Sequence, residues 1–219
     1  HRSNPVLLGM VRLFPWVNPA ALDEEVRALA AHRQGWLNPP FFVVRTLVYF
    51  ALWIGVGHLL WRWSVRQDAE GGAALTAAQR RLGAGALPFV GLAMTFAAFD
   101  WQMSLDLRLS STIFGLYWFA GSFLSAFAVV ILAVNAARGV EGSPGALMNA
   151  NHYHALGKYL LAFVAFWAYM AFSQYLLIWI ANLPEEVPWY LARNQGGWLP
   201  VGVIMALFHF VVPFFVLLS

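Results

Sequence analysis

The sequence predicts an all-α membrane protein with about five transmembrane helices, four of them forming a helix bundle, plus a short N-terminal interfacial helix. Of the 219 residues, 61% are hydrophobic and only 11% are charged, whereas about a quarter of the residues in soluble domains are charged. Apolar runs recur along the chain, each long enough for roughly 30 Å of hydrocarbon. Eleven Trp and seven Tyr residues fit the aromatic belts at lipid headgroups.

Residues 1–38 are expected to form an interfacial, connecting segment. Asn18 and Pro19 predict the start of a short helix, acidic residues follow in its first turn, and Gly35 predicts its end. Residues 6–14 are apolar but short, as in the last turns of a preceding membrane helix. Because the chain begins with His1, we interpret it as part of a longer polytopic protein.

The transmembrane bundle is predicted within residues 39–219. The expected helices cover approximately residues 41–63, 86–103, 111–137, 152–181 and 198–218. Polar residues 64–81 are expected to form the loop between the first two helices, and residues 139–151 form a turn-rich loop. Basic residues are more frequent in cytoplasmic loops, so we expect one end of the helices to face the cytoplasm. That end carries Arg62, Arg66, Arg80, Arg81, Arg138 and Lys158.

Composition and motifs exclude several functions. The chain has no cysteine, which excludes iron–sulfur ligation, covalent haem and thiolate zinc within it. Its net charge of +3 is too small for a nucleic-acid footprint. It lacks phosphate-binding, zinc-protease and nucleophile-elbow motifs. His209 has no second histidine at a matching depth, so a bis-histidine haem is not expected. The sequence therefore predicts neither a metal site nor a self-contained catalytic centre.

Asp100 is the first candidate functional residue, because a carboxylate at the edge of a hydrocarbon layer is expensive and needs a partner or a function. Counted from the loop between the first two helices, Arg45 and Asp100 lie within roughly 6 Å of the same depth. This predicts an Arg45–Asp100 ion pair, which could be purely structural or could serve a proton or ligand. In the turn that follows, we expect Asp106 to pair with Arg108.

The helix over residues 152–181 carries a polar seam. At about 100° per residue, one arc contains His154, Lys158, Ala162, Ala165, Tyr169 and Ser173. Such a seam should point into a bundle, where it predicts a proton or hydrogen-bond path. The alternative is that His154 and Lys158 extend from a helix end to the headgroups. Glu185 and Glu186 follow in a loop, where adjacent acids are usually just solvated.

Five stretches of the sequence resemble the NrfD-like (polysulfide-reductase-type) membrane subunits of alternative complex III. They are FAAFDWQMSLD at 96–106, STIFGLY at 111–117, HYHALGK at 152–158, FWAYMAFSQY at 166–175 and IWIANLPEE at 178–186. The resemblance extends over nearly all of residues 36–219 and is closer to the ActF type than to its quinol-site sister. It implies a subunit of about ten helices in two bundles, of which this chain is the C-terminal half. One departure is Leu107, where we expect proline.

The resemblance also implies a function. Alternative complex III is a bacterial quinol:cytochrome c oxidoreductase of the inner membrane, and the implied role is quinol-linked electron transfer with a proton pathway through the bundle. The implied pathway residues are Asp100, His154, Lys158, Tyr169, Ser173 and Glu185. The implied partners are the sister NrfD-like subunit, an iron–sulfur subunit, haem c subunits and a terminal oxidase. Haem c and iron–sulfur clusters would be bound by these partners and no cofactor by this chain, with quinone binding left open.

Two other functions compete with this one. A secondary transporter or channel could use the same polar seam, although transporters usually show internal repeats and helices broken at the midplane. A purely structural membrane anchor for extracytoplasmic redox subunits would need no pathway at all.

Overall fold

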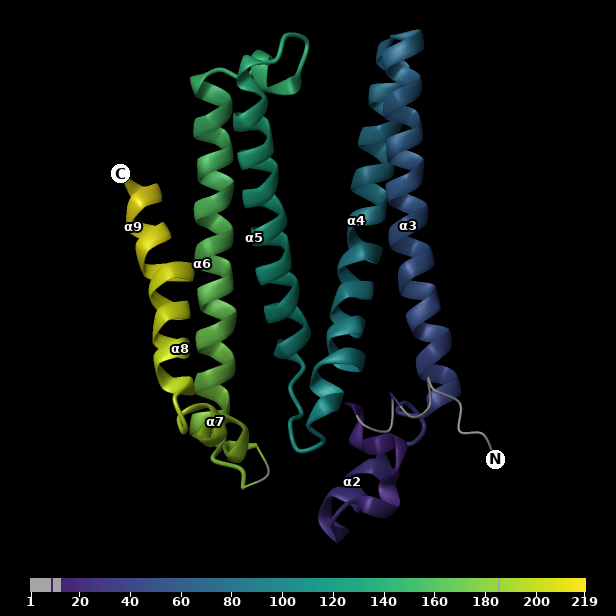
Figure 1. Ribbon diagram of the computed structural model, residues 1–219, viewed down its shortest axis with the longest axis vertical. Helices are drawn as coiled ribbons and strands as arrows, with labels where there is room; N and C mark the ends of the chain where they lie inside the picture. The colour runs from purple at the N-terminus through teal and green to yellow at the C-terminus, as the bar shows by residue number, and fades with distance from the viewer. Residues whose placement is uncertain (1–8, 10–12, 185) are drawn as a thin grey trace. The chain divides into compact units, whose positions relative to one another are not determined.

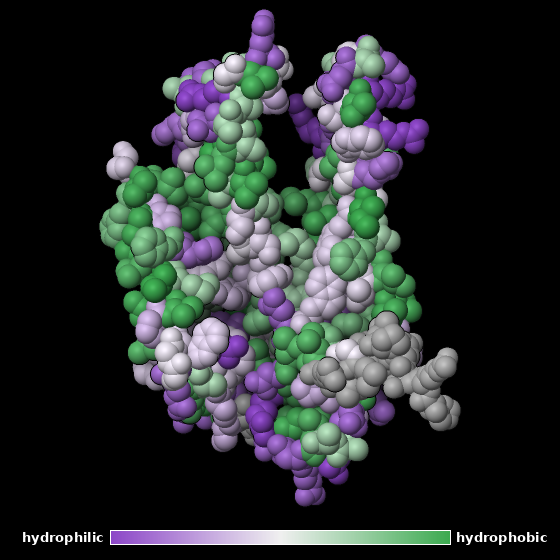
Figure 2. All heavy atoms as spheres, viewed as in Figure 1, coloured by the Kyte–Doolittle hydropathy of each residue, from purple (hydrophilic) through white to green (hydrophobic). Residues whose placement is uncertain are grey.

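The computed structural model describes residues 9, 13–184 and 186–219, and all regular structure in this part of the chain is helical. Five of the described helices are long and apolar enough to cross a membrane: Pro39–Glu70, Ala73–Leu105, Ile113–Gly139, Ala150–Ala181 and Trp198–Leu218. Hydrophobic side chains cover these helices and hydrophilic ones gather at their ends (Figure 2). The chain is therefore an all-α, multi-pass membrane protein, as the sequence predicts. It divides into two compact units, residues 1–110 and 111–219.

The first unit is built on a hairpin of two long helices, α3 (Pro39–Glu70) and α4 (Ala73–Trp101) (Figure 1). Asn38 caps α3, because its side-chain oxygen accepts a hydrogen bond from the Phe41 amide at 3.0 Å. Gly71 and Gly72 connect the helices with φ angles of 69° and 96°, which glycine adopts without steric cost.

The prediction of a loop over residues 64–81 is wrong, because both helices continue through this polar stretch and only the two glycines interrupt them. Polar contacts stabilise the extension. Arg66 pairs with Glu70 one turn later at 2.9 Å. Across the turn, the Gln67 amide donates to Thr76 Oγ1, and the Gln79 amide donates to Gln67 Oε1 at 2.8 Å. At 32 residues, α3 is about 48 Å long and extends beyond a hydrocarbon layer of roughly 30 Å.

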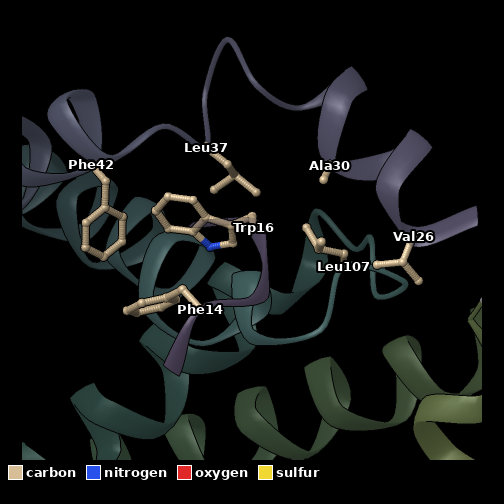
Figure 3. Close-up of a cluster of buried hydrophobic side chains, with 7 residues drawn as sticks. All are labelled: Phe14, Trp16, Val26, Ala30, Leu37, Phe42 and Leu107. Carbon is tan, nitrogen blue, oxygen red and sulfur yellow. The ribbon is translucent and has the colours of Figure 1, made fainter. Parts of the chain in front are cut away.

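The N-terminal segment packs onto the other end of this hairpin. It contains two short 3₁₀ turns, η1 (Pro15–Val17) and η2 (Pro19–Ala21), and the helix α2 (Glu24–His32). Its apolar side chains join those at the start of α3 and after α4 in one buried cluster: Phe14, Trp16, Val26, Ala30, Leu37, Phe42 and Leu107. Figure 3 shows the Trp16 indole between Phe14, Phe42 and Leu37. The N-terminal segment with its short helix α2 therefore covers one end of the α3–α4 hairpin, within the first unit.

One expectation for this segment is corrected. The helix begins at Glu24 and not near Pro19, because the Asp23 side chain caps it by accepting from the Val26 amide at 2.9 Å. Leu107, where a proline was expected, is only 2% exposed and belongs to the buried cluster. The apolar stretch at residues 6–14 lies mostly outside the described residues.

The second unit pairs α5 (Ile113–Ala136) with α6 (Ala150–Ala181) (Figure 1). Buried Ala120, Leu124, Val164 and Trp167 form their interface. Between the helices lie two short 3₁₀ turns, η4 (Ala137–Gly139) and η5 (Pro144–Leu147). Asn149 and His152 form a capping box at the start of α6.

The chain returns after α6 through a short helix, α7 (Val187–Arg193), and a final membrane span. This span consists of α8 (Trp198–Ala206), a π-helical turn, η6 (Leu207–Val211), and α9 (Val212–Leu218). Phe210, Phe214 and Leu217 on this span pack against the α5–α6 interface. The predicted fifth helix is therefore present and contains one wider turn near its middle.

Candidate functional site

Asp100 lies in the last turn of α4 and is completely buried. Its Oδ1 accepts hydrogen bonds from Trp36 Nε1 and from Arg45 Nη2, both at 2.8 Å. Its Oδ2 accepts from Arg45 Nε at 2.8 Å and from the Tyr49 hydroxyl at 2.9 Å. A carboxylate offers about four lone-pair positions, and all of them are used here.

The Arg45 side chain is also buried, with 7% of its surface exposed. It forms a bidentate ion pair with Asp100, the geometry for which a guanidinium is best suited. Its remaining terminal nitrogen, Nη1, donates to the Trp36 carbonyl at 2.9 Å. The guanidinium also lies over the rings of Trp36 and Phe41, at 4.1 and 4.3 Å from their centroids. The ion pair predicted from helix depth is therefore present, and its charges are fully enclosed by partners.

Local sequence explains how these groups converge. Arg45 and Tyr49 are four residues apart on α3 and so share one face, which packs against α4. Trp36 comes from the loop before α3, and its indole reaches Asp100 from the side of the N-terminal segment. The Ser104 hydroxyl donates to the Asp100 carbonyl after the helix ends, which satisfies one of the orphan carbonyls there. We call the buried residues Arg45, Tyr49, Asp100 and Ser104, together with Trp36, which is 38% exposed, the buried polar cluster.

The turn beyond this cluster differs from the sequence prediction. Asp106 does not pair with the Arg108 guanidinium; its Oδ1 accepts from the Arg108 backbone amide at 3.0 Å. The guanidinium reaches Asp23 at 3.2 Å and Glu25 at 3.9 Å. Arg108 therefore ties the turn after α4 to the start of α2. These contacts are exposed and contribute little to stability.

The four polar residues of the α6 seam lie in the second unit. His154, Lys158 and Tyr169 are exposed within the structure, and Ser173 is half-buried. No hydrogen bond joins these side chains within the described part of the chain. Lys158 and Tyr169 are eleven residues apart, which is about 17 Å along a helix, too far for direct proton transfer. A pathway along the seam would need intervening water.

The remaining pathway candidate, Glu185, lies outside the described residues. The predicted four-helix bundle stays a prediction.

The face of α6 that packs against α5 is not the seam but the opposite side. Its buried residues are Val164, Trp167, Met170, Gln174 and Ile178. Gln174 is about 200° around the helix from His154, whereas the seam covers about the first 100°. Gln174 is not among the predicted site residues, because these follow the polar side chains of one arc only. The signal was a glutamine within an apolar stripe spaced at three or four residues.

Gln174 is only 4% exposed, and among the described residues neither its Nε2 nor its Oε1 has a hydrogen-bond partner. It lines a groove of about 1140 Å³ bounded by α6, α7, the final span and the start of α5. An unsatisfied buried amide costs about 1–3 kcal/mol. Such a group in a native structure calls for an explanation, of which a ligand or water is one.

His209 is the second unpartnered group of this unit. It lies in the π-helical turn η6, with its ring 4.2 Å from the Trp167 ring, and its buried Nε2 has no partner among the described residues. π-helical turns occur frequently at functional sites. Within the described residues, no three His, Asp or Glu side chains gather closely enough to hold a metal ion.

Tyr190 lies at the α7 end of the groove. Burial raises the pKa of its hydroxyl to about 12; Tyr117 and Tyr175 nearby act in the same direction, and the positive charge of Arg193 opposes them. The Tyr190 ring contacts those of Tyr175 and Trp189 edge-on, at 5.3 and 4.7 Å.

Comparison with known proteins gives no family assignment: the chain matches no protein-family model and no curated protein.

Proposed function

We propose that this chain is an NrfD-like membrane subunit of a bacterial quinol:cytochrome c oxidoreductase, alternative complex III, in the inner membrane. It supports quinol-linked electron transfer carried out by partner subunits that bind haem c and iron–sulfur clusters. The proposal rests first on the five stretches of sequence that resemble this family. Their first stretch, residues 96–106, includes Asp100, whose burial at the end of a transmembrane hairpin gives that stretch a structural role.

The two units would contribute differently to this function. In the first unit, the buried polar cluster uses every lone pair of Asp100, which favours a structural role for this residue over proton exchange. Among the predicted pathway residues that the structure describes, His154, Lys158 and Tyr169 on α6 are exposed. We therefore assign any proton pathway of this chain to α6 and remove Asp100 from it.

A second candidate function is a purely structural anchor for extracytoplasmic redox subunits. The closed geometry of the buried polar cluster favours it, because a hairpin end fixed by Trp36, Arg45 and Asp100 and covered by the N-terminal segment forms a stable platform. It differs from the first proposal only in the role of α6.

Purification of the full protein from its native membrane in mild detergent tests the shared part of both proposals. We expect haem c absorbance, iron–sulfur signals and quinol:cytochrome c oxidoreductase activity to copurify with the chain. A chain that purifies without any redox partner, from membranes in which those subunits are present, would contradict both and favour a transporter.

The Lys158→Leu variant then distinguishes pathway from anchor. A pathway through α6 predicts intact assembly and quinol oxidation with fewer protons released per electron. The matched control is Arg138→Leu, which also removes a positive charge. Arg138 lies outside the seam, with its guanidinium 4.7 Å from the centroid of the Tyr153 ring. Equal proton release per electron in both variants and in the wild type would contradict a pathway through α6 and support the structural anchor.

A further inference from the structure

The groove in the second unit is amphipathic along its length. At its α7 end lie Trp189, Tyr190, Arg193 and Trp198, the residue types that occur at lipid headgroups. From Trp198 the groove follows the final span to Phe214 and is otherwise lined mainly by apolar side chains. Trp198 and Phe214 are sixteen positions apart, which corresponds to about 24 Å of helix, more than half of a hydrocarbon layer of roughly 30 Å. A long molecule with one polar end fits this arrangement.

Gln174 indicates the depth at which a ligand in this groove would need a polar group. It lies about 13 Å from the midpoint of α6, close to the half-thickness of roughly 15 Å at which hydrocarbon ends. Its Nε2 needs an acceptor and its Oε1 needs a donor, and the described residues supply neither. Three side-chain torsions allow the amide to turn toward the groove that it lines.

We propose that this groove binds one membrane glycerophospholipid, with an acyl chain along α8 and α9 and an ester carbonyl accepting a hydrogen bond from Gln174 Nε2. The ester groups of a bilayer lie at the depth of Gln174, where interfacial water reaches and donates to Oε1. The headgroup lies at the α7 end, beside the aromatic side chains. This inference does not depend on the electron-transfer function.

Chemistry favours a lipid over a protein segment as the occupant. The groove opens along a final span whose residues are mostly exposed, so acyl chains have direct access to it. A transmembrane helix satisfies its own backbone groups and would leave the Gln174 amide unpaired unless it carried a polar side chain at that depth. A lipid ester supplies the acceptor without a sequence requirement.

The test uses the purified full protein, delipidated in detergent and titrated with palmitoyl-oleoyl phosphatidylglycerol, with binding of the first lipid followed by native mass spectrometry. Gly202 lines the groove, and a Cβ atom added there meets open space, so Gly202→Leu places a side chain in the groove. The matched control is Gly157→Leu, because Gly157 is also helical and open but lies outside the groove.

We expect Gly202→Leu to weaken binding of the first lipid at least tenfold and Gly157→Leu to leave it unchanged. Gln174→Leu should weaken binding roughly three- to tenfold, the loss expected for one hydrogen bond. Equal affinities in the wild type and in Gly202→Leu would overturn the proposal. So would displacement of the lipid by an equimolar short-chain quinone, which would assign the groove to a ring ligand. Circular dichroism of each variant confirms that the helices are retained.

Discussion

Asp100 and Gln174 are both buried polar residues near one end of a long apolar helix, yet their surroundings are opposite. Asp100 accepts four hydrogen bonds from three side chains. Gln174 receives none among the described residues, although its side chain is almost as deeply buried. The hydrogen-bond partners of Asp100 all belong to this chain, whereas the proposed partner of Gln174 is a lipid from outside it. Burial alone does not distinguish a structural residue from a binding residue; hydrogen-bond satisfaction does.

The largest expected effect comes from breaking the ion pair. Arg45→Met leaves the Asp100 carboxylate buried without its counter-charge and should lower the free energy of unfolding by about 3–5 kcal/mol. Steric trapping in bicelles measures this quantity. The control is Arg66→Met, which removes an exposed pair with Glu70 and should cost less than about 1 kcal/mol. Similar values for the two variants would contradict the structural role of the buried polar cluster.

A smaller effect is expected from Tyr49→Phe, which removes one donor and keeps the ring. The lost bond goes to a charged acceptor and should cost about 1.5–3 kcal/mol. The same unfolding measurement applies. Tyr159→Phe serves as the comparison, since Tyr159 is 60% exposed and its hydroxyl should contribute almost nothing. A neutral Tyr49→Phe would mean that three donors suffice for Asp100.

Gln174→Leu should behave in the opposite way to Arg45→Met and Tyr49→Phe, which remove partners of Asp100. With no lipid present, it removes an unsatisfied amide and should leave stability unchanged or raise it by up to about 1 kcal/mol. The measurement is unfolding of the delipidated protein. A loss of several kcal/mol would mean that Gln174 is already satisfied within the protein, and the contrast with Asp100 would disappear.

The smallest effect concerns alkaline pH and Tyr190. Burial raises its pKa to about 12, above the value of about 10 in an unfolded chain. The stabilisation of the neutral hydroxyl is therefore complete below pH of about 10 and is lost as the pH rises through about 12. Tyr190→Phe should reduce this alkaline loss of thermal stability, whereas Tyr159→Phe should not. An identical pH profile for both variants would place Tyr190 in contact with solvent.

The sequence predicts the helices of this fold better than their ends. Hydropathy locates each span, because lipid requires apolar side chains. It cannot locate the ends of α3 and α4, where Gln67, Thr76 and Gln79 continue the hairpin outside the hydrocarbon through polar contacts. These contacts depend on which side chains meet across a two-glycine turn, and periodicity does not encode that.

The candidate site shows the same division. Depth counting along two helices predicts the Arg45–Asp100 pair, because a hairpin fixes relative depth. It cannot predict the hydrogen bond from Trp36 to Asp100, because Trp36 comes from a loop. Nor can it predict that the Asp106 carboxylate accepts from the Arg108 backbone amide and does not pair with the Arg108 guanidinium. Gln174 lies outside the arc of α6 whose polar side chains predict the seam, so that pattern does not indicate it.

The Arg45–Asp100 pair has a consequence for how the protein is made. The two residues are 55 positions apart, and α3 leaves the ribosome before α4. During that interval Arg45, in the second turn of α3, has no counter-charge at the edge of the membrane, and an unpaired charge inside a membrane span is costly. The pair therefore favours entry of α3 and α4 into the bilayer together, as a preformed hairpin with its charges already joined.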